Sequence, residues 1–227
     1  MRGLQIPFTR MGRVTSCDLF EPREQALFDF YEKHKSRYRR AIDIGANIGI
    51  HSILMAKCGW LVTAYEPDPK HFRQLEQNLY ANDCFPDGEM SVVPINMAVS
   101  TKDGYAPFIR VLDNETANHL AGARESYGPR EQIMVPTIDC RSLFAWADFA
   151  KIDCEGSEPE LLLTVTAGTR CEFMVEVGTA LAAAKIFNHF HGWREMWSQA
   201  SGWGQVLTLN DMPKHYTQGA IFIGERP

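Results

Sequence analysis

The sequence contains no paired cysteines, and this absence removes two common classes of site. A zinc ribbon or a thioredoxin-type redox centre needs a C-x-x-C pair, and no two cysteines here have that spacing. The six cysteines stand singly, at Cys17, Cys58, Cys84, Cys140, Cys154 and Cys171. Isolated cysteines in apolar surroundings are typical of reduced thiols, so the sequence predicts a cytoplasmic protein.

Long apolar runs and dense positive charge are also scarce. No apolar stretch reaches the ~18 residues that a membrane span needs, and residues 1–13 lack the apolar centre of a signal peptide. The net charge is −5 and the isoelectric point about 5.8, and only residues 32–40 form a dense cationic run. We therefore expect no membrane partner, and no nucleic acid held across the whole surface.

Two phosphate-binding fingerprints are missing as well. The dinucleotide pattern G-x-G-x-x-G fails after Gly45, because Asn47 and Ile50 stand where its second and third glycines belong. A P-loop is excluded because the sequence has no G-K-[ST] after a glycine-rich turn. A nicotinamide dehydrogenase is therefore only a remote alternative.

An alternation of strands and helices is present instead. Apolar runs that end at glycine or proline alternate with segments of helical period. They read strand, helix, strand, helix, strand, over residues 41–44, 50–59, 60–66, 69–83 and 90–100. This order predicts a parallel sheet covered by helices on both faces. A preceding helix is predicted from Pro22 to Lys35, with an apolar face of Leu27, Phe30, Tyr31 and His34.

The second half of the chain is predicted to extend the same sheet. A polar loop from Asp113 to Arg130 lies between two short strands, and we interpret it as a binding loop or lid. Two further strands are expected within residues 148–156 and 171–178. Residues 204–210 and 219–225 predict a closing antiparallel hairpin.

A glycine turn and two carboxylates follow the first two predicted strands. Asp43 ends the first strand, Gly45 and Gly49 shape the turn, and Glu66 ends the second strand about 20 residues later. Glu66 is placed to accept two ribose hydroxyls, and Asp43 is expected to face a cationic group. A ligand with a ribose, an ammonium and no phosphate is S-adenosylmethionine. Asn47 is expected to shape the turn or to reach the methionine carboxylate of that ligand.

Four stretches in this order resemble the FkbM-type methyltransferases, which use S-adenosylmethionine. They are AIDIGANIGIHS at 41–52, VTAYEPDPKHFRQLEQNLYAN at 62–82, NMAVSTKDG at 96–104 and AKIDCEGSEPELL at 150–162. The resemblance implies an α/β, Rossmann-like class I methyltransferase fold: a seven-stranded, mostly parallel sheet with helices on both faces and a C-terminal antiparallel hairpin. It also implies methyl transfer to an oxygen, often on a sugar or natural product.

The resemblance also suggests how the chain is divided. We expect one methyltransferase domain over residues 1–227, with an N-terminal helical extension at 1–38 and a core at 39–227 that binds S-adenosylmethionine. Ala98 and Val99 lie at the end of the third predicted strand region, where they would form the wall beside the adenine ring. The expected partner is a small-molecule or glycan acceptor, and the oligomeric state is open.

Charged residues crowd the strand end within residues 149–162. Lys151 and Asp153 share one face, because side chains alternate along a strand. We expect Asp153 to take the proton from the acceptor hydroxyl and Lys151 to orient Asp153 or stabilise the oxyanion. Glu155 could do either job. An alternative role for Asp153 and Glu155, together with Glu176, is to hold Mg²⁺.

Three weaker predictions concern neighbouring residues. Ser157 and Glu160 are spaced as a capping box for the next helix, which leaves them no chemical role. His119 lies in the polar loop and is an alternative proton acceptor, since histidine titrates near neutral pH. His51, at the start of a helix, is expected to serve packing.

The sequence leaves three functions open. The first is O-methylation of a hydroxyl on a sugar, glycan or small natural product. The second is methylation of a ribose 2′-oxygen or another nucleic-acid position, with phosphate contacts from residues 32–40. The third is a catalytically silent protein that binds S-adenosylmethionine and acts through a partner.

Overall fold

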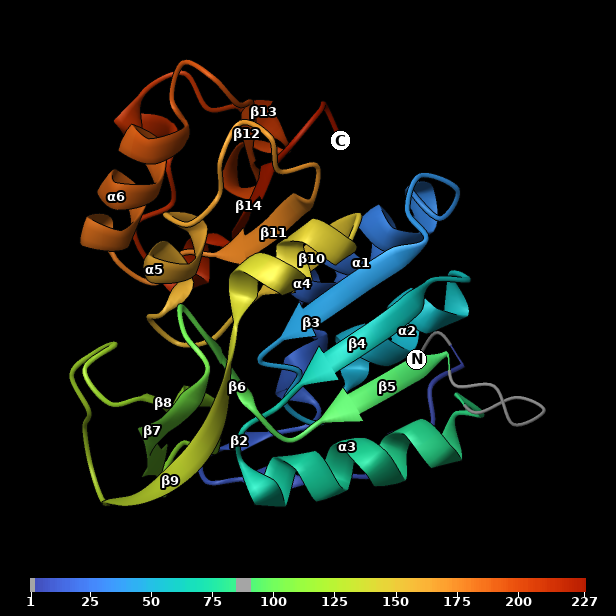
Figure 1. Cartoon of the computed structure of the whole chain (residues 1–227). Coiled ribbons are helices and arrows are strands. Elements are labelled where there is room, and N and C mark those ends of the chain that lie inside the picture. The colour runs from blue at the N-terminus through green and yellow to red at the C-terminus, as the bar shows by residue number, and fades with distance from the viewer. Residues whose placement is uncertain (1–2, 85–90) are drawn as a thin grey trace.

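The computed structural model shown in Figure 1 describes residues 3–84 and 91–227. Met90, with which the third predicted strand begins, and the first two residues of the N-terminal stretch lie outside the described residues. No helix within the described part of the chain is long and apolar enough to cross a membrane.

Within these residues the centre of the fold is an eight-stranded, mostly parallel sheet (Figure 1). Its order is β13-β12-β14-β11-β10-β3-β4-β5. The parallel strands are β3 (Arg40–Ile44), β4 (Leu61–Tyr65), β5 (Val92–Ile95), β10 (Phe149–Ile152) and β11 (Glu172–Glu176). From β3 the strands are added on one side as β4 and β5, and the later strands β10 and β11 are added on the other side of β3. This change of side between β3 and β10 places a crevice at their carboxyl ends.

The sheet has the expected antiparallel end, but the predicted hairpin between residues 204–210 and 219–225 is wrong, because these two segments do not pair with each other. β14 (Ala220–Ile223) pairs with β11 and with β12 (Met196–Ser198). The predicted hairpin partner at residues 204–210 contributes only β13 (Gly204–Gln205), which pairs with β12. This two-residue strand raises the number of strands from the expected seven to eight.

The third predicted strand divides between two sheets. β5 ends at Ile95, and β6 (Ala98–Ser100) pairs in parallel with β9 (Arg130–Asp139) in a four-stranded sheet of order β6-β9-β7-β8. The break follows from Asn96, whose side-chain amide donates to the carbonyl oxygens of Glu66 and Pro67. The remaining strands of this sheet are β7 (Gly104–Val111) and β8 (His119–Leu120). A separate hairpin joins β1 (Arg10–Met11) and β2 (Val14–Thr15).

Helices cover both faces of the central sheet (Figure 1). Residues of α1 (Pro22–Lys33), α2 (Ile50–Lys57) and α3 (Pro69–Ala81) share one buried cluster, and those of α4 (Cys140–Trp146), α5 (Glu158–Leu162) and α6 (Ala180–Phe190) share another. Short 3₁₀ helices lie at η1 (Asp18–Phe20), η3 (Glu115–Ala117), η4 (Gln199–Ser201), η5 (Leu209–Asp211) and η6 (Tyr216–Gln218). The predicted apolar face of α1 is confirmed, since Leu27, Phe30, Tyr31 and His34 are all buried.

Candidate active site

The turn from β3 into α2 can be built only with glycine at its first bend. Gly45 has φ +77°, and a Cβ there would lie 1.9 Å from the carbonyl oxygen of Asp153. Gly49 has φ +90°, and its Cβ would lie 2.3 Å from Leu75 Cδ1. The glycines therefore let the turn pass directly beside the end of β10 and pack α2 against α3.

Glu66 holds the tip of this turn. Its carboxylate accepts the backbone N–H of Asn47 at 2.9 Å and that of Asp68 at 2.8 Å. Burial raises the pKa of Glu66, against the opposing effects of His71 and the two backbone donors. The Asn47 side-chain Oδ1 is buried without a hydrogen-bond partner. A carboxylate can accept more than two hydrogen bonds, so both side chains have acceptor capacity left for a ligand.

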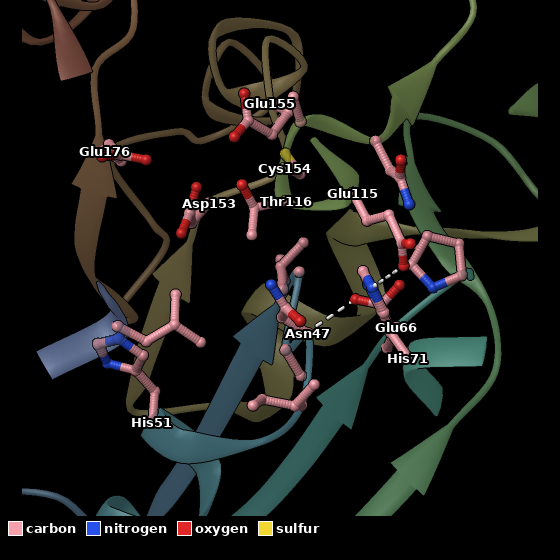
Figure 2. A pocket seen from close by; sticks show the side chains of 18 of the residues that line it. Asn47, His51, Glu66, His71, Glu115, Thr116, Asp153, Cys154, Glu155 and Glu176 are labelled. Atoms are coloured by element: carbon pink, nitrogen blue, oxygen red, sulfur yellow. Dashed lines mark hydrogen bonds and ion pairs between the residues drawn. The ribbon is translucent and has the colours of Figure 1, made fainter. Parts of the chain in front are cut away.

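A cavity of about 610 Å³ lies over the carboxyl ends of β3, β4 and β10. Of the predicted cofactor residues, it is lined by Gly45, Asn47, Glu66, Ala98 and Val99. Figure 2 shows Asn47 between two groups of acidic side chains, with Glu66 and Glu115 to one side and Asp153, Glu155 and Glu176 to the other. The structure therefore brings these five cofactor residues and the predicted catalytic residues Lys151, Asp153 and Glu155 into one space.

Asp43 and Gly49 do not line this cavity. The Asp43 side chain is fully buried, accepts the Ser52 hydroxyl at 2.6 Å and lies 3.6 Å from Lys151 Nζ. Strand register explains the second contact, because Asp43 and Lys151 are paired neighbours on β3 and β10. The cation that Asp43 faces is therefore Lys151, in place of a group on the ligand.

Lys151 and Asp153 form a buried ion pair at the end of β10, with 3.1 Å between Nζ and Oδ2. Burial opposes the charge on Lys151, but Asp153 and Asp43 outweigh it and raise its pKa above the ordinary value. Burial also opposes ionisation of Asp153, and Lys151 reverses that effect, so the pKa of Asp153 is lowered. Both groups are charged at neutral pH, and Asp153 can accept a proton.

Glu155 and Glu176 are protonated more readily than ordinary glutamates. Burial and the charge on Asp153 raise the pKa of Glu155 to about 8, although Arg124 pairs with its carboxylate. The same two causes raise the pKa of Glu176, and Asp153 and Glu176 also share a hydrogen bond. Among residues 3–84 and 91–227, no three His, Cys, Asp or Glu side chains are grouped to hold a metal ion. The Mg²⁺ hypothesis for Asp153, Glu155 and Glu176 therefore has no support here.

The predicted capping box at α5 is wrong. Ser157 makes no side-chain hydrogen bond at the helix start, and Glu160 instead pairs with Lys185 at 2.9 Å. Glu158 instead holds the loop before the helix, because its carboxylate accepts the N–H groups of Cys154 and Gly156.

The polar loop closes over the cofactor side of the cavity through η3. Glu115 accepts from Lys70 Nζ at 2.6 Å and lies 3.3 Å from His71 Nε2, next to Glu66. His119, in contrast, points inward: its ring nitrogens contact the Ala117 carbonyl at 2.8 Å and the Ser126 hydroxyl at 2.9 Å. It is buried and does not line the cavity, so the structure does not bring this proposed proton acceptor to the site.

Sequence reasoning missed the contact of His51 with Glu24 and Tyr31 at the site. His51 lines the cavity, where its ring joins Glu24 of α1 to Tyr31, also of α1. One signal was available: Glu24 falls on the helical stripe that contains Leu27 and Tyr31, and a carboxylate on an apolar stripe needs a partner.

Comparison with known proteins places the chain in a functional class. The sequence model of the methyltransferase FkbM domain matches residues 43–200. No curated protein matches the sequence. Among solved structures, a human methyltransferase 10 domain containing protein is 14% identical over 97% of this chain and 88% of that chain, with a TM-score of 0.50. The N-terminal domain of human METTL16 is 14% identical over 97% of this chain and 74% of that chain, with a TM-score of 0.50. These two structures share the fold.

Proposed function

This protein belongs to the FkbM methyltransferase family, and we propose that it transfers the methyl group of S-adenosylmethionine to a hydroxyl oxygen of a small-molecule or glycan acceptor. The observation that carries the proposal is the shared cavity, which reaches from Glu66 to the Lys151–Asp153 pair. One space of about 610 Å³ gives room for a nucleoside donor and an acceptor side by side.

The residues on the cofactor side fit S-adenosylmethionine. Glu66 has acceptor capacity for ribose hydroxyls, and the unpartnered Oδ1 of Asn47 can accept from an ammonium. Ala98, Val99 and Phe108 give an apolar wall for the adenine. When bound, the cofactor supplies a methyl group on a positively charged sulfur, which is already a good leaving group.

Asp153 is the proposed proton acceptor for the acceptor hydroxyl. Its carboxylate lies at the cavity wall, and the adjacent Lys151 keeps it ionised. The carboxylate of Asp153 would accept the proton of the acceptor hydroxyl, and bound S-adenosylmethionine would supply the methyl group that this oxygen takes up. Lys151 would stabilise the partial negative charge on the acceptor oxygen while its proton is leaving. Glu155, held by Arg124, borders the same space and orients the acceptor.

The charge of the cavity counts against a nucleic-acid acceptor. Among the described residues that line it, eight acidic side chains stand against four arginine or lysine side chains, and the acidic excess remains when Glu155 and Glu176, whose pKa values are raised, are left out. A bound RNA or DNA strand brings phosphates that need cationic partners. A neutral acceptor avoids this repulsion.

Calorimetric titration of S-adenosylmethionine into wild type, Glu66→Ala and Glu160→Ala tests the proposal, each with and without Mg²⁺. We expect binding to wild type, binding about 10–100-fold weaker in Glu66→Ala because charged hydrogen bonds are lost, and no change in the exposed control Glu160→Ala. The absence of binding to wild type would contradict the proposal.

Methyl-transfer assays then separate the acceptor classes. Product formation on neutral sugars or polyols supports the proposal. Transfer to an RNA oligonucleotide alone would support a nucleic-acid methyltransferase instead. Binding of S-adenosylmethionine without turnover on either class would favour a catalytically silent binding protein.

A further inference from the structure

Helix α1 contributes a carboxylate to the cavity from outside the residues that the family model matches. Glu24 lies in the first turn of α1 and lines the cavity, whereas the match begins at residue 43. Its side chain is only 21% exposed, so it is enclosed by protein on most sides. A buried carboxylate costs free energy unless it is paired or used, and this raises the question of what Glu24 binds.

A chain of two hydrogen bonds fixes the position of Glu24. His51 Nε2 lies 3.1 Å from Glu24 Oε2, and His51 Nδ1 lies 2.9 Å from the hydroxyl of fully buried Tyr31. Burial favours protonation of Glu24, but the hydrogen bond and charge of His51 outweigh it and lower its pKa. Because an ionised carboxylate only accepts, the hydrogen bond to Glu24 is donated by the Nε2–H of His51.

One oxygen of Glu24 keeps its acceptor capacity. The nearest cation to Oε1 is Arg23 Nε at 3.8 Å, which is longer than a hydrogen bond. Arg23 is itself closer to Glu21, at 3.3 Å. Glu24 lines the same cavity as Asp153 and Lys151. A ligand that contacts the catalytic pair can therefore also reach the carboxylate of Glu24.

The cations of the cavity wall are all engaged by carboxylates. Lys151 pairs with Asp153, Arg124 with Glu155, Arg23 with Glu21 and Arg13 with Asp113. The charge that a phosphate or carboxylate on the acceptor would need is therefore already largely balanced, although Arg23 Nε has no hydrogen-bond partner. A neutral polyol instead offers hydroxyl donors, which suit carboxylates such as Glu24 and Asp153.

We propose that Glu24 is the acceptor-binding residue of the N-terminal segment: its Oε1 accepts a hydrogen bond from a second hydroxyl of a neutral, polyhydroxylated acceptor, and its charge excludes phosphorylated ones. His51 and Tyr31 are positioning residues that hold Glu24 in place. This inference rests on the proposed function, because it assigns a specificity to the same cavity.

Steady-state kinetics of Glu24→Gln test the inference, with methyl α-D-glucopyranoside and myo-inositol as neutral acceptors and glucose 6-phosphate as the anionic one. The control is Glu32→Gln, which changes an exposed carboxylate of the same helix that does not line the cavity. In Glu24→Gln we expect the KM for the neutral acceptors to rise about tenfold, because a charged hydrogen bond becomes a neutral one. The kcat and the affinity for S-adenosylmethionine stay within about twofold. Turnover of glucose 6-phosphate increases relative to wild type.

Two further variants test the positioning residues. Tyr31→Phe removes only the hydroxyl and is expected to raise the acceptor KM less than Glu24→Gln does. His51→Gln keeps an N–H donor toward Glu24 and should retain more activity than His51→Ala. A merely structural role would instead lower the unfolding temperature and kcat together, without this dependence on the acceptor.

The outcomes separate the inference from the proposed function. If wild type binds S-adenosylmethionine but methylates no neutral acceptor, the proposed function fails and the inference fails with it. If wild type methylates a neutral acceptor and Glu24→Gln keeps the wild-type KM and selectivity, the inference alone is overturned. Loss of cofactor binding in folded Glu24→Gln would also overturn it.

Discussion

Lys151 lies between Asp153 of its own chain segment and Asp43 of the neighbouring strand, with 3.1 Å from its Nζ to Asp153 Oδ2. Residues two apart on a strand share a face, which explains the first contact, and parallel register explains the second. One ammonium thus balances two carboxylates, and only Asp153 of these two lines the cavity. Asp43 holds the ammonium of Lys151 in place, and the charge of Lys151 lowers the pKa of Asp153.

Replacement of Asp153 by Asn should abolish most turnover while the cofactor still binds. The amide cannot take the proton of the acceptor hydroxyl, so we expect kcat to fall about 10²–10⁴-fold. Single-turnover methyl transfer and calorimetry measure the two effects separately. Retention of wild-type kcat would show that another group accepts the proton.

Replacement of Lys151 by Met should destabilise the fold itself. It would leave the fully buried Asp43 and the partly exposed Asp153 without their counter-charge, at a cost of about 3–5 kcal/mol in the free energy of unfolding. Lys185→Met is the matched control, because its ion pair with Glu160 is exposed and should contribute at most about 1 kcal/mol. Urea unfolding checks both values, and equal losses in the two variants would contradict the prediction.

A methyl group at Gly45 should disrupt the site more than one at Gly59. Both residues have positive φ, at +77° and +90°, so replacement of either by alanine strains the backbone and lowers the free energy of unfolding. Only at Gly45 would the new Cβ strike a backbone oxygen, that of Asp153 at 1.9 Å, whereas Gly59 has open space. We expect Gly45→Ala to lose cofactor affinity and thermal stability, and Gly59→Ala to lose about 1 kcal/mol of stability with normal affinity. Similar affinities in both variants would refute the close approach.

The contact between His71 and Glu115 predicts a pH window for stability. Hydrogen bonding to His71 lowers the pKa of Glu115 to about 2 from 4.5, against the opposing effect of burial. This stabilisation is present above pH 4.5 and is lost as the pH falls towards 2. Burial disfavours the charged form of His71, but Glu115 and its acidic neighbours outweigh that effect and raise its pKa above 6.5. That stabilisation is present below pH 6.5 and is lost as the pH rises through the raised value.

The difference in unfolding free energy between wild type and Glu115→Gln should therefore be largest between pH 4.5 and 6.5. Urea unfolding at a series of pH values measures it. Glu125→Gln, an exposed change in the same loop, should give a small difference at every pH. A difference for Glu115→Gln that does not vary with pH would contradict the assignment.

Sequence patterns within short segments were sufficient to predict much of the fold. The order of β3, α2, β4 and α3 follows from apolar period, glycine and proline, which act over a few residues. The same reasoning failed for residues 90–100, because Asn96 interrupts the strand by bonding to carbonyls of Glu66 and Pro67, 30 and 29 positions away. It also failed for His119, since the loop around it turns that ring inward.

The sequence by itself determined the alternation of strands and helices, the glycine turn, and the shared face of Lys151 and Asp153. These depend on backbone geometry and on spacing within one segment. The pairing of Asp43 with Lys151 depended on strand register, and the approach of Glu24 to His51 depended on how α1 packs on the sheet. Only the tertiary structure decided these contacts, because their free energy comes from groups that are distant in sequence and meet only in the packed chain.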